Sequence, residues 1–298
     1  MLMKERSVKA YLMLISAMLI FGTIGIFRRY IPLSSGMLAF SRGLLGSAFL
    51  FVFIRARGGK WEKIAPAQIR LLLLSGSLIG LNWILLFEAY NYTTVATATM
   101  CYYMEPTLVI LLSPLVLQEK MTAKRLLCTL ASIGGMVCIS GLLEGGGAGG
   151  RDIRGIACGL GAAALYASVV ILNKKTRVDN AYQKTCVQLT AATVVLIPYL
   201  LLTENWAAIR LDGRAVLMVL AVGIVHTGIA YTLYFGSMKG LKAQSIAVLS
   251  YIDPVFALII STAVLHEKMS PLGVIGSALI IGSALVSEIS VQKRKSSI

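Results

Sequence analysis

Long apolar stretches alternate with short polar connections from one end of the chain to the other. Ten of these stretches are long enough to cross a bilayer as helices, because a span needs about 20 predominantly apolar residues. They cover residues 10–27, 36–54, 69–88, 94–117, 124–143, 153–173, 182–203, 215–235, 242–265 and 271–290. Strand-like alternation is rare, so the pattern predicts an all-α integral membrane protein with ten transmembrane helices rather than a β-barrel.

The composition agrees with this prediction. Of the 298 residues, 57% are hydrophobic and only 14% are charged, whereas soluble domains are about a quarter charged. A net charge of +15 would indicate nucleic-acid binding in a soluble protein. Here the basic residues form short clusters between apolar stretches, which favours a membrane protein with lipid contacts and no nucleic-acid partner. The five cysteines lie in apolar stretches without C-x-x-C spacing, so the sequence predicts neither disulfides nor a metal site.

The basic residues also predict an orientation. If the connections alternate between the two sides, 20 of the 28 lysines and arginines fall on one side and seven on the other, and Arg42 lies inside a span. Cytoplasmic connections carry the excess of lysine and arginine. We therefore expect both termini in the cytoplasm and a multi-pass protein of the cytoplasmic membrane.

The chain also matches itself at an offset of 148 residues. Residues 103–106 (Tyr-Met-Glu-Pro) align with residues 251–254 (Tyr-Ile-Asp-Pro), and residues 119–121 align with residues 267–269 (both Glu-Lys-Met). The two matches share one register without a gap, which is improbable by chance for polar positions.

This repeat predicts two halves, residues 1–147 and 148–298, with five spans each. Because five is odd, the second half enters the membrane from the opposite side. Inverted repeats of this kind are the architecture of alternating-access carriers, whose substrate site lies at mid-membrane between the copies.

These motifs resemble the EamA-type members of the drug/metabolite transporter superfamily. The resemblance covers essentially the whole chain and is carried by residues 103–120 and 251–268, together with Gly134, Gly276 and Gly282. It implies a ten-helix carrier whose cavity is walled by spans 1–4 and 6–9, with spans 5 and 10 at the edge. The family transports amino acids, nucleosides, sugars, amines and drugs, so the resemblance does not name a substrate.

Two acidic residues are the main candidates for substrate binding or ion coupling. Glu105 and Asp253 are each the twelfth residue of their predicted span, which places both near mid-membrane. Carboxylates at this depth are costly, and they usually face a cavity. The prolines that follow, Pro106 and Pro254, remove a backbone donor, so we expect a kink and a freed carbonyl in each helix. One open alternative is that either acid only hydrogen-bonds a neighbouring helix.

A buried arginine is the second anomaly. Arg42 lies within span 2 and cannot shed its charge, so it needs a partner or an anionic ligand. Glu88 is the nearest acidic residue by depth. The sequence therefore predicts an Arg42–Glu88 pair, with direct binding of a substrate carboxylate as the alternative.

Aromatic and polar residues complete the candidate site. Rings beside carboxylates bind ammonium groups by cation–π attraction, whereas other rings, notably Tyr90 and Tyr92, are expected in the interfacial belt. A histidine in span 8 is a candidate proton relay or a packing residue. The further site candidates are Trp83, Tyr231, Tyr102, Ser250, Asn82 and His226.

Together these features predict a secondary carrier of small polar metabolites, with amino acids or amine-bearing compounds as the expected substrates and export favoured by family tendency. The alternative is an exporter of lipophilic cations, and a channel or membrane enzyme fits less well because polar groups converge at mid-depth. No nucleotide-binding motif is found, so we expect no ATP site and no cofactor, and we leave proton, ion or exchange coupling open. A monomer and a homodimer are both compatible with the sequence.

Overall fold

The computed structural model describes residues 2–59, 61–116, 122–139, 150–206, 209, 211–238, 241 and 249–295, and all its regular elements are helical over those ranges. The first half comprises α1 (Leu2–Gly22), α2 (Ile24–Arg29), α3 (Ser35–Ala56), α4 (Pro66–Tyr92), α5 (Val95–Tyr102), α6 (Glu105–Val116) and α7 (Ala123–Ile139). The second comprises α8 (Gly150–Lys175), α9 (Ala181–Thr203), α10 (Gly213–Leu220), the π-helix η3 (Ala221–Ile229), α11 (Ala230–Met238), α13 (Ile252–Val264) and α14 (Pro271–Lys295).

The helices have the length and apolarity of a multi-pass membrane protein. Seven segments within the described residues are long and apolar enough to cross a membrane, and α7, α13 and α14 contain shorter apolar helices at the positions of the other three predicted spans. The all-helical prediction is confirmed, while the count of ten crossings and the orientation of the termini stay predictions. The boundary between residues 147 and 148 and the Glu-Lys pair at residues 119–120 lie outside the described residues.

Both acid-proline motifs interrupt their helix rather than only bending it. Span 4 consists of α5, a turn at residues 103–104, and α6, which begins at Glu105. Tyr251 is likewise a turn residue directly before α13. Each acid and its proline therefore occupy the first turn of a helix. Proline is tolerated there because the backbone donors of that turn have no intrahelical acceptor, and a carboxylate is favoured by the helix dipole.

Two further irregularities lie in spans 1 and 8. Thr23 is a turn residue between α1 and α2, and span 8 contains the π-helix η3. The two irregular segments touch, because Thr23 Oγ1 lies 2.8 Å from Nε2 of His226 in η3. Neither feature is visible in the hydrophobic pattern.

Close helix packing depends on glycine at several crossings. A Cβ on Gly76 of α4 would stand 2.4 Å from the Gln188 carbonyl oxygen of α9. A Cβ on Gly159 of α8 would stand 2.6 Å from Cys101 of α5. These helices approach nearly to backbone contact, as small residues permit in membranes.

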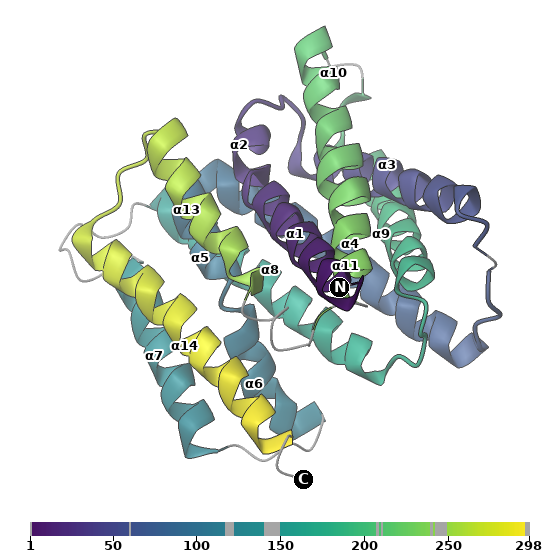
Figure 1. Ribbon diagram of the computed structural model, residues 1–298. Helices are drawn as coiled ribbons and strands as arrows, with labels where there is room; N and C mark the ends of the chain where they lie inside the picture. The colour runs from purple at the N-terminus through teal and green to yellow at the C-terminus, as the bar shows by residue number, and fades with distance from the viewer. Residues whose placement is uncertain are drawn as a thin grey trace.

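Contacts between the two halves occur in reciprocal sets. Helix α1 packs against α11 and α13, and in the other half the equivalent helix α8 packs against α4 and α6. Helix α3 packs against η3, and its equivalent α9 packs against α4. Helices α7 and α14 pair with each other at one edge of the bundle (Figure 1). This edge placement agrees with the expectation for spans 5 and 10.

Candidate functional site

A cavity of about 400 Å³ lies where the interrupted helices meet. Its walls come from α1, α2, α3, α4, α5, α6, α8, α11 and α13, together with turn residues beside them. None of its lining residues comes from α7 or α14, and within the described residues α9 supplies none either. Span 7 is therefore a supporting helix here, contrary to the expectation that all of spans 6–9 wall the cavity.

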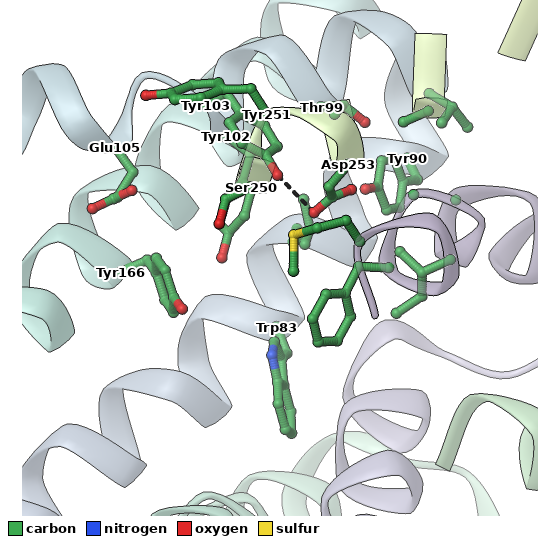
Figure 2. Close-up of a pocket in the computed structure, with 18 of the residues that line it drawn as sticks. Trp83, Tyr90, Thr99, Tyr102, Tyr103, Glu105, Tyr166, Ser250, Tyr251 and Asp253 are labelled. Carbon is green, nitrogen blue, oxygen red and sulfur yellow. Dashed lines mark hydrogen bonds between the residues drawn. The ribbon is translucent and has the colours of Figure 1, made fainter. Parts of the chain in front are cut away.

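Most of the predicted site residues converge on this cavity. Seven of the ten candidates line it: Glu105, Asp253, Arg42, Trp83, Tyr231, Tyr102 and Ser250. Pro106 also lines it, whereas Pro254 is buried and does not. Figure 2 shows Glu105 and Asp253 on different helices, with tyrosines between and around them.

The two acids differ in their surroundings. The Tyr103 hydroxyl donates a hydrogen bond of 2.6 Å to Asp253 Oδ2, drawn as the dashed line in Figure 2. Tyr103 follows α5, so this bond joins span 4 to span 9. Glu105 begins α6 and lies on the side of the cavity where Tyr166 is found (Figure 2). The two carboxylates thus enter one cavity from two half-helices.

Asp253 also lies against the break in span 1. A Cβ built on Gly22 would come within 2.8 Å of the Asp253 carbonyl oxygen. A Cβ built on Gly25 would come within 2.4 Å of the Val95 side chain. Both glycines line the cavity, and their lack of a side chain lets α1 and α2 approach α13 and α5 closely.

The predicted Arg42–Glu88 pair is wrong. Arg42 is only 4% exposed, and its Nε donates to Thr227 Oγ1 at 3.2 Å. Its guanidinium carbon lies 4.1 Å from the centre of the Trp83 ring and 5.6 Å from that of Phe87. Similar depth in two helices does not fix the direction in which each side chain points, which is why the sequence suggested the wrong partner.

Glu88 instead belongs to a polar cluster outside the cavity. Asn91 Nδ2 donates to Glu88 Oε2 at 3.4 Å, and Arg28 donates to Asn91 Oδ1 at 2.8 Å. Arg28 also donates to the Ile31 carbonyl at 3.0 Å. Glu88 is therefore not among the residues that line the cavity.

Asn82 and His226 also lie outside the cavity. Asn82 is fully buried and donates to the Ala162 carbonyl of α8 at 2.6 Å. His226 contacts Thr23 and has Nδ1 3.2 Å from the Ala221 carbonyl oxygen. These contacts fit the packing alternative for the histidine and a helix-joining role for the asparagine.

Several cavity tyrosines were not among the predicted site residues. Tyr90, expected in the interfacial belt, is instead 4% exposed and lines the cavity. The other cavity tyrosines, which the sequence offers only as further aromatic rings and not as site residues, are Tyr103, Tyr166, Tyr234 and Tyr251. The repeat offers a signal for two of them, because Tyr103 and Tyr251 are equivalent positions beside the acids, and their ring centres lie 6.5 Å apart.

An ion pair lies where α2, α5 and the connection after α13 come together. Arg29 donates to Glu267 Oε1 at 2.8 Å, and the backbone N–H of Val95 donates to Glu267 Oε2 at 2.9 Å. The Ser261 hydroxyl also donates to Oε2. Glu267 therefore connects three segments, one of which carries the cavity residue Val95.

Comparison with known proteins assigns the class. The sequence model of the EamA-like transporter family matches residues 8–141 and again residues 153–288. An "Uncharacterized transporter YxxF" of Bacillus subtilis (strain 168) is 30% identical over 260 residues, which are 87% of this chain and 82% of that protein. An "Uncharacterized transporter" of Vibrio cholerae serotype O1 is 26% identical over 289 residues, 92% of each chain.

A solved crystal structure with 20% sequence identity superposes with a TM-score of 0.67 over 95% of this chain and 98% of that chain. This likeness supports the fold alone. Together with the apolar helices, the matches define a multi-pass membrane transporter. The chain belongs to the EamA-like transporter family, and the two successive family matches confirm the internal repeat.

Proposed function

We propose that the chain is a secondary carrier of small polar metabolites, amino acids or amine-bearing compounds, in the cytoplasmic membrane. The observation that carries this proposal is the 400 Å³ cavity in which Glu105 and Asp253 approach from two interrupted helices. Carboxylates attract an ammonium group, and the surrounding tyrosine and tryptophan rings add cation–π attraction. The volume falls within the range of small-molecule sites, about 300–1,000 Å³.

The carrier works by alternating access between two inverted halves, residues 1–147 and 148–298. The reciprocal helix contacts support this arrangement, since a two-fold relation between the halves generates each contact twice. Rocking one half against the other opens the central cavity first to one side and then to the other. Export is the direction we favour.

The gradient of a coupled ion or an exchanged solute drives transport in this proposal. The sequence contains no nucleotide-binding motif, and the two cavity carboxylates are groups that a proton can neutralise. Protonation of Glu105 or Asp253 in step with substrate release would couple a proton gradient to substrate movement. The carrier acts as a monomer or a homodimer.

A second candidate function is the export of lipophilic cations. It is favoured by the number of aromatic rings in the cavity, among them Trp83, Tyr102, Tyr166 and Tyr231. Such a carrier needs the acids and rings but no anion-binding group. A channel or an enzyme is less well supported, because the polar groups gather in one cavity walled by several helices.

The test is a ligand-stabilisation screen of the purified protein against amino acids, polyamines and quaternary ammonium compounds. The proposal predicts a rise in melting temperature with amino acids or small amines, and loss of that rise in both Glu105→Gln and Asp253→Asn. Stabilisation only by quaternary ammonium compounds supports the second candidate. Stabilisation that survives both substitutions contradicts a site at these carboxylates.

A further inference from the structure

Arg42 is the one cationic side chain among the described residues that line the cavity. It lies on α3, and only 4% of its surface is exposed. Within the described part of the chain, its one hydrogen bond runs from Nε to Thr227 Oγ1 at 3.2 Å. Among the described residues, Arg42 forms no ion pair within 4 Å. The ion pair that the described residues do form joins Arg29 to Glu267.

The surroundings of Arg42 hold the guanidinium in place without neutralising its charge. The Thr227 hydroxyl donates to the Val222 carbonyl at 3.1 Å, so its oxygen is oriented to accept from Arg42 Nε. A Cβ on Gly46 would lie 2.3 Å from Thr227 Cγ2, which means that α3 and η3 are in close contact here. Trp83 packs its ring 4.1 Å from the guanidinium carbon.

This leaves the two terminal amino groups of Arg42 without an acceptor among the described residues. A buried cation without a charged partner is costly, and ring contact compensates only part of that cost. The terminal edge of a guanidinium presents parallel N–H donors that match the two oxygens of a carboxylate. Arg42 lines the same cavity as Glu105 and Asp253.

We propose that Arg42 binds the carboxylate of the transported substrate, while the cavity acids bind its ammonium group. The substrate class is then a zwitterion of the amino-acid type rather than a simple amine or a lipophilic cation. This inference rests on the transport function proposed above and narrows its substrate. Trp83 and Thr227 act as positioning residues, because they hold the guanidinium from its face and from its Nε edge.

The rival explanation is that Arg42 only ties α3 to η3 through Thr227. The two explanations differ in selectivity. Loss of a structural tie weakens the binding of every ligand alike, whereas loss of a carboxylate anchor weakens only the ligands that carry a carboxylate.

The experiment measures affinity with matched probes on the full-length protein in detergent. Each of the twenty amino acids is compared with the amine obtained by removing its carboxylate, for example L-phenylalanine with 2-phenylethylamine. Inorganic phosphate and tetraphenylphosphonium are added as an unrelated anion and a lipophilic cation. The proposal predicts that at least one amino acid binds about tenfold or more tightly than its amine.

Three variants identify the group responsible for this preference. Arg42→Gln is expected to bind acid and amine equally, with the affinity for the amine unchanged or higher. Arg42→Lys is expected to retain part of the preference, because the charge stays and the fork is lost. Arg28→Gln removes another buried arginine, one outside the cavity, and is expected to keep the full preference.

Melting temperatures and gel-filtration profiles of all variants separate misfolding from loss of the anchor. The inference is overturned if amines or tetraphenylphosphonium bind as tightly as amino acids, or if phosphate is the one probe whose binding Arg42→Gln weakens. It is also overturned if Arg42→Gln still binds amino acids more tightly than their amines. Absence of any binding of amino acids to the unaltered protein overturns it as well. The transport function itself fails separately, if the reconstituted protein moves none of these compounds.

Discussion

Tyr103 donates a hydrogen bond of 2.6 Å to Asp253, and the two residues come from equivalent motifs of the two repeats. Tyr103 precedes Glu105 by two residues, as Tyr251 precedes Asp253. The bond therefore links the tyrosine of one motif to the acid of the other. It is a direct connection between the two halves at the cavity.

Removing this bond is expected to weaken substrate binding. Tyr103→Phe leaves the ring but takes away the donor that orients the Asp253 carboxylate. Hydrogen bonds to charged groups are worth about 1.5–3 kcal/mol of stability, so we predict a lower melting temperature as well as weaker ligand binding. Titration of the best ligand from the stabilisation screen measures the affinity. Tyr199→Phe, on the exposed face of α9, serves as the control and should bind normally. Unchanged affinity in Tyr103→Phe contradicts the role given to this bond.

The Arg29–Glu267 pair is expected to hold one end of the cavity closed. Glu267→Gln weakens the contact with Arg29. The Arg29 side chain is 36% exposed and the Glu267 side chain 12% exposed. A partly exposed pair is worth up to about 1 kcal/mol, so the open state should gain about fivefold in population. A cysteine placed at Ser250 in a cysteine-free background should then react several-fold faster with an impermeant thiol reagent.

Lys268→Gln is the matched control for this experiment, because it removes the neighbouring charge and leaves the pair intact. Its labelling rate should equal that of the parent protein. Equal rates in Glu267→Gln and the parent exclude a closing role for the pair.

Gly22→Ala tests the close approach of α1 to α13. The new Cβ would stand 2.8 Å from the Asp253 carbonyl oxygen. This contact is too short, and because the oxygen belongs to the backbone, α1 or α13 has to shift to relieve it. Overpacking of this kind costs about 1–3 kcal/mol, so a lower melting temperature and weaker ligand binding are expected. At Gly282 of α14, a Cβ would meet nothing within 4 Å. Gly282→Ala should therefore be neutral or slightly stabilising, and an equal loss in both variants contradicts the packing argument.

The inversion of the repeats predicts opposite labelling of equivalent positions. Single cysteines at Lys120 and Lys268, which align at the 148-residue offset, should react with an impermeant reagent from opposite sides of the membrane. Labelling of both from one side contradicts the inverted arrangement. This measurement also determines the side on which the termini lie.

The sequence predicted which charged residues line the cavity better than it predicted the direction of their side chains. Position within a span singled out Glu105, Asp253 and Arg42, because a charge at mid-span is unusual in any helix, and all three line the cavity. It did not give the rotation of each helix about its axis, so Arg42 was paired with Glu88 and not with Trp83 and Thr227.

Local backbone irregularities were the other limit. The prolines predicted bends at the acids, but the structure has turn residues there instead, residues 103–104 before Glu105 and Tyr251 before α13. The π-helix that brings Thr227 to Arg42 has no proline or charge to mark it, and it packs against α3 from the other half of the chain. Tyr90 shows the same limit, since its position near a helix end suggested the membrane surface while its neighbours enclose it.

The main proposal is that the protein transports a substrate, bound in the cavity between the repeats, across the membrane without ATP. Uptake into proteoliposomes measures this transport. The ligand that most strongly stabilises the protein is used as a radiolabelled probe, with an imposed pH gradient and with the probe preloaded inside. We expect uptake by the unaltered protein that responds to one of these gradients and falls at least tenfold in Glu105→Gln and Asp253→Asn, while Gly282→Ala transports normally. Uptake with an unchanged gradient response in both carboxylate variants, or no uptake by the unaltered protein under either gradient, contradicts it.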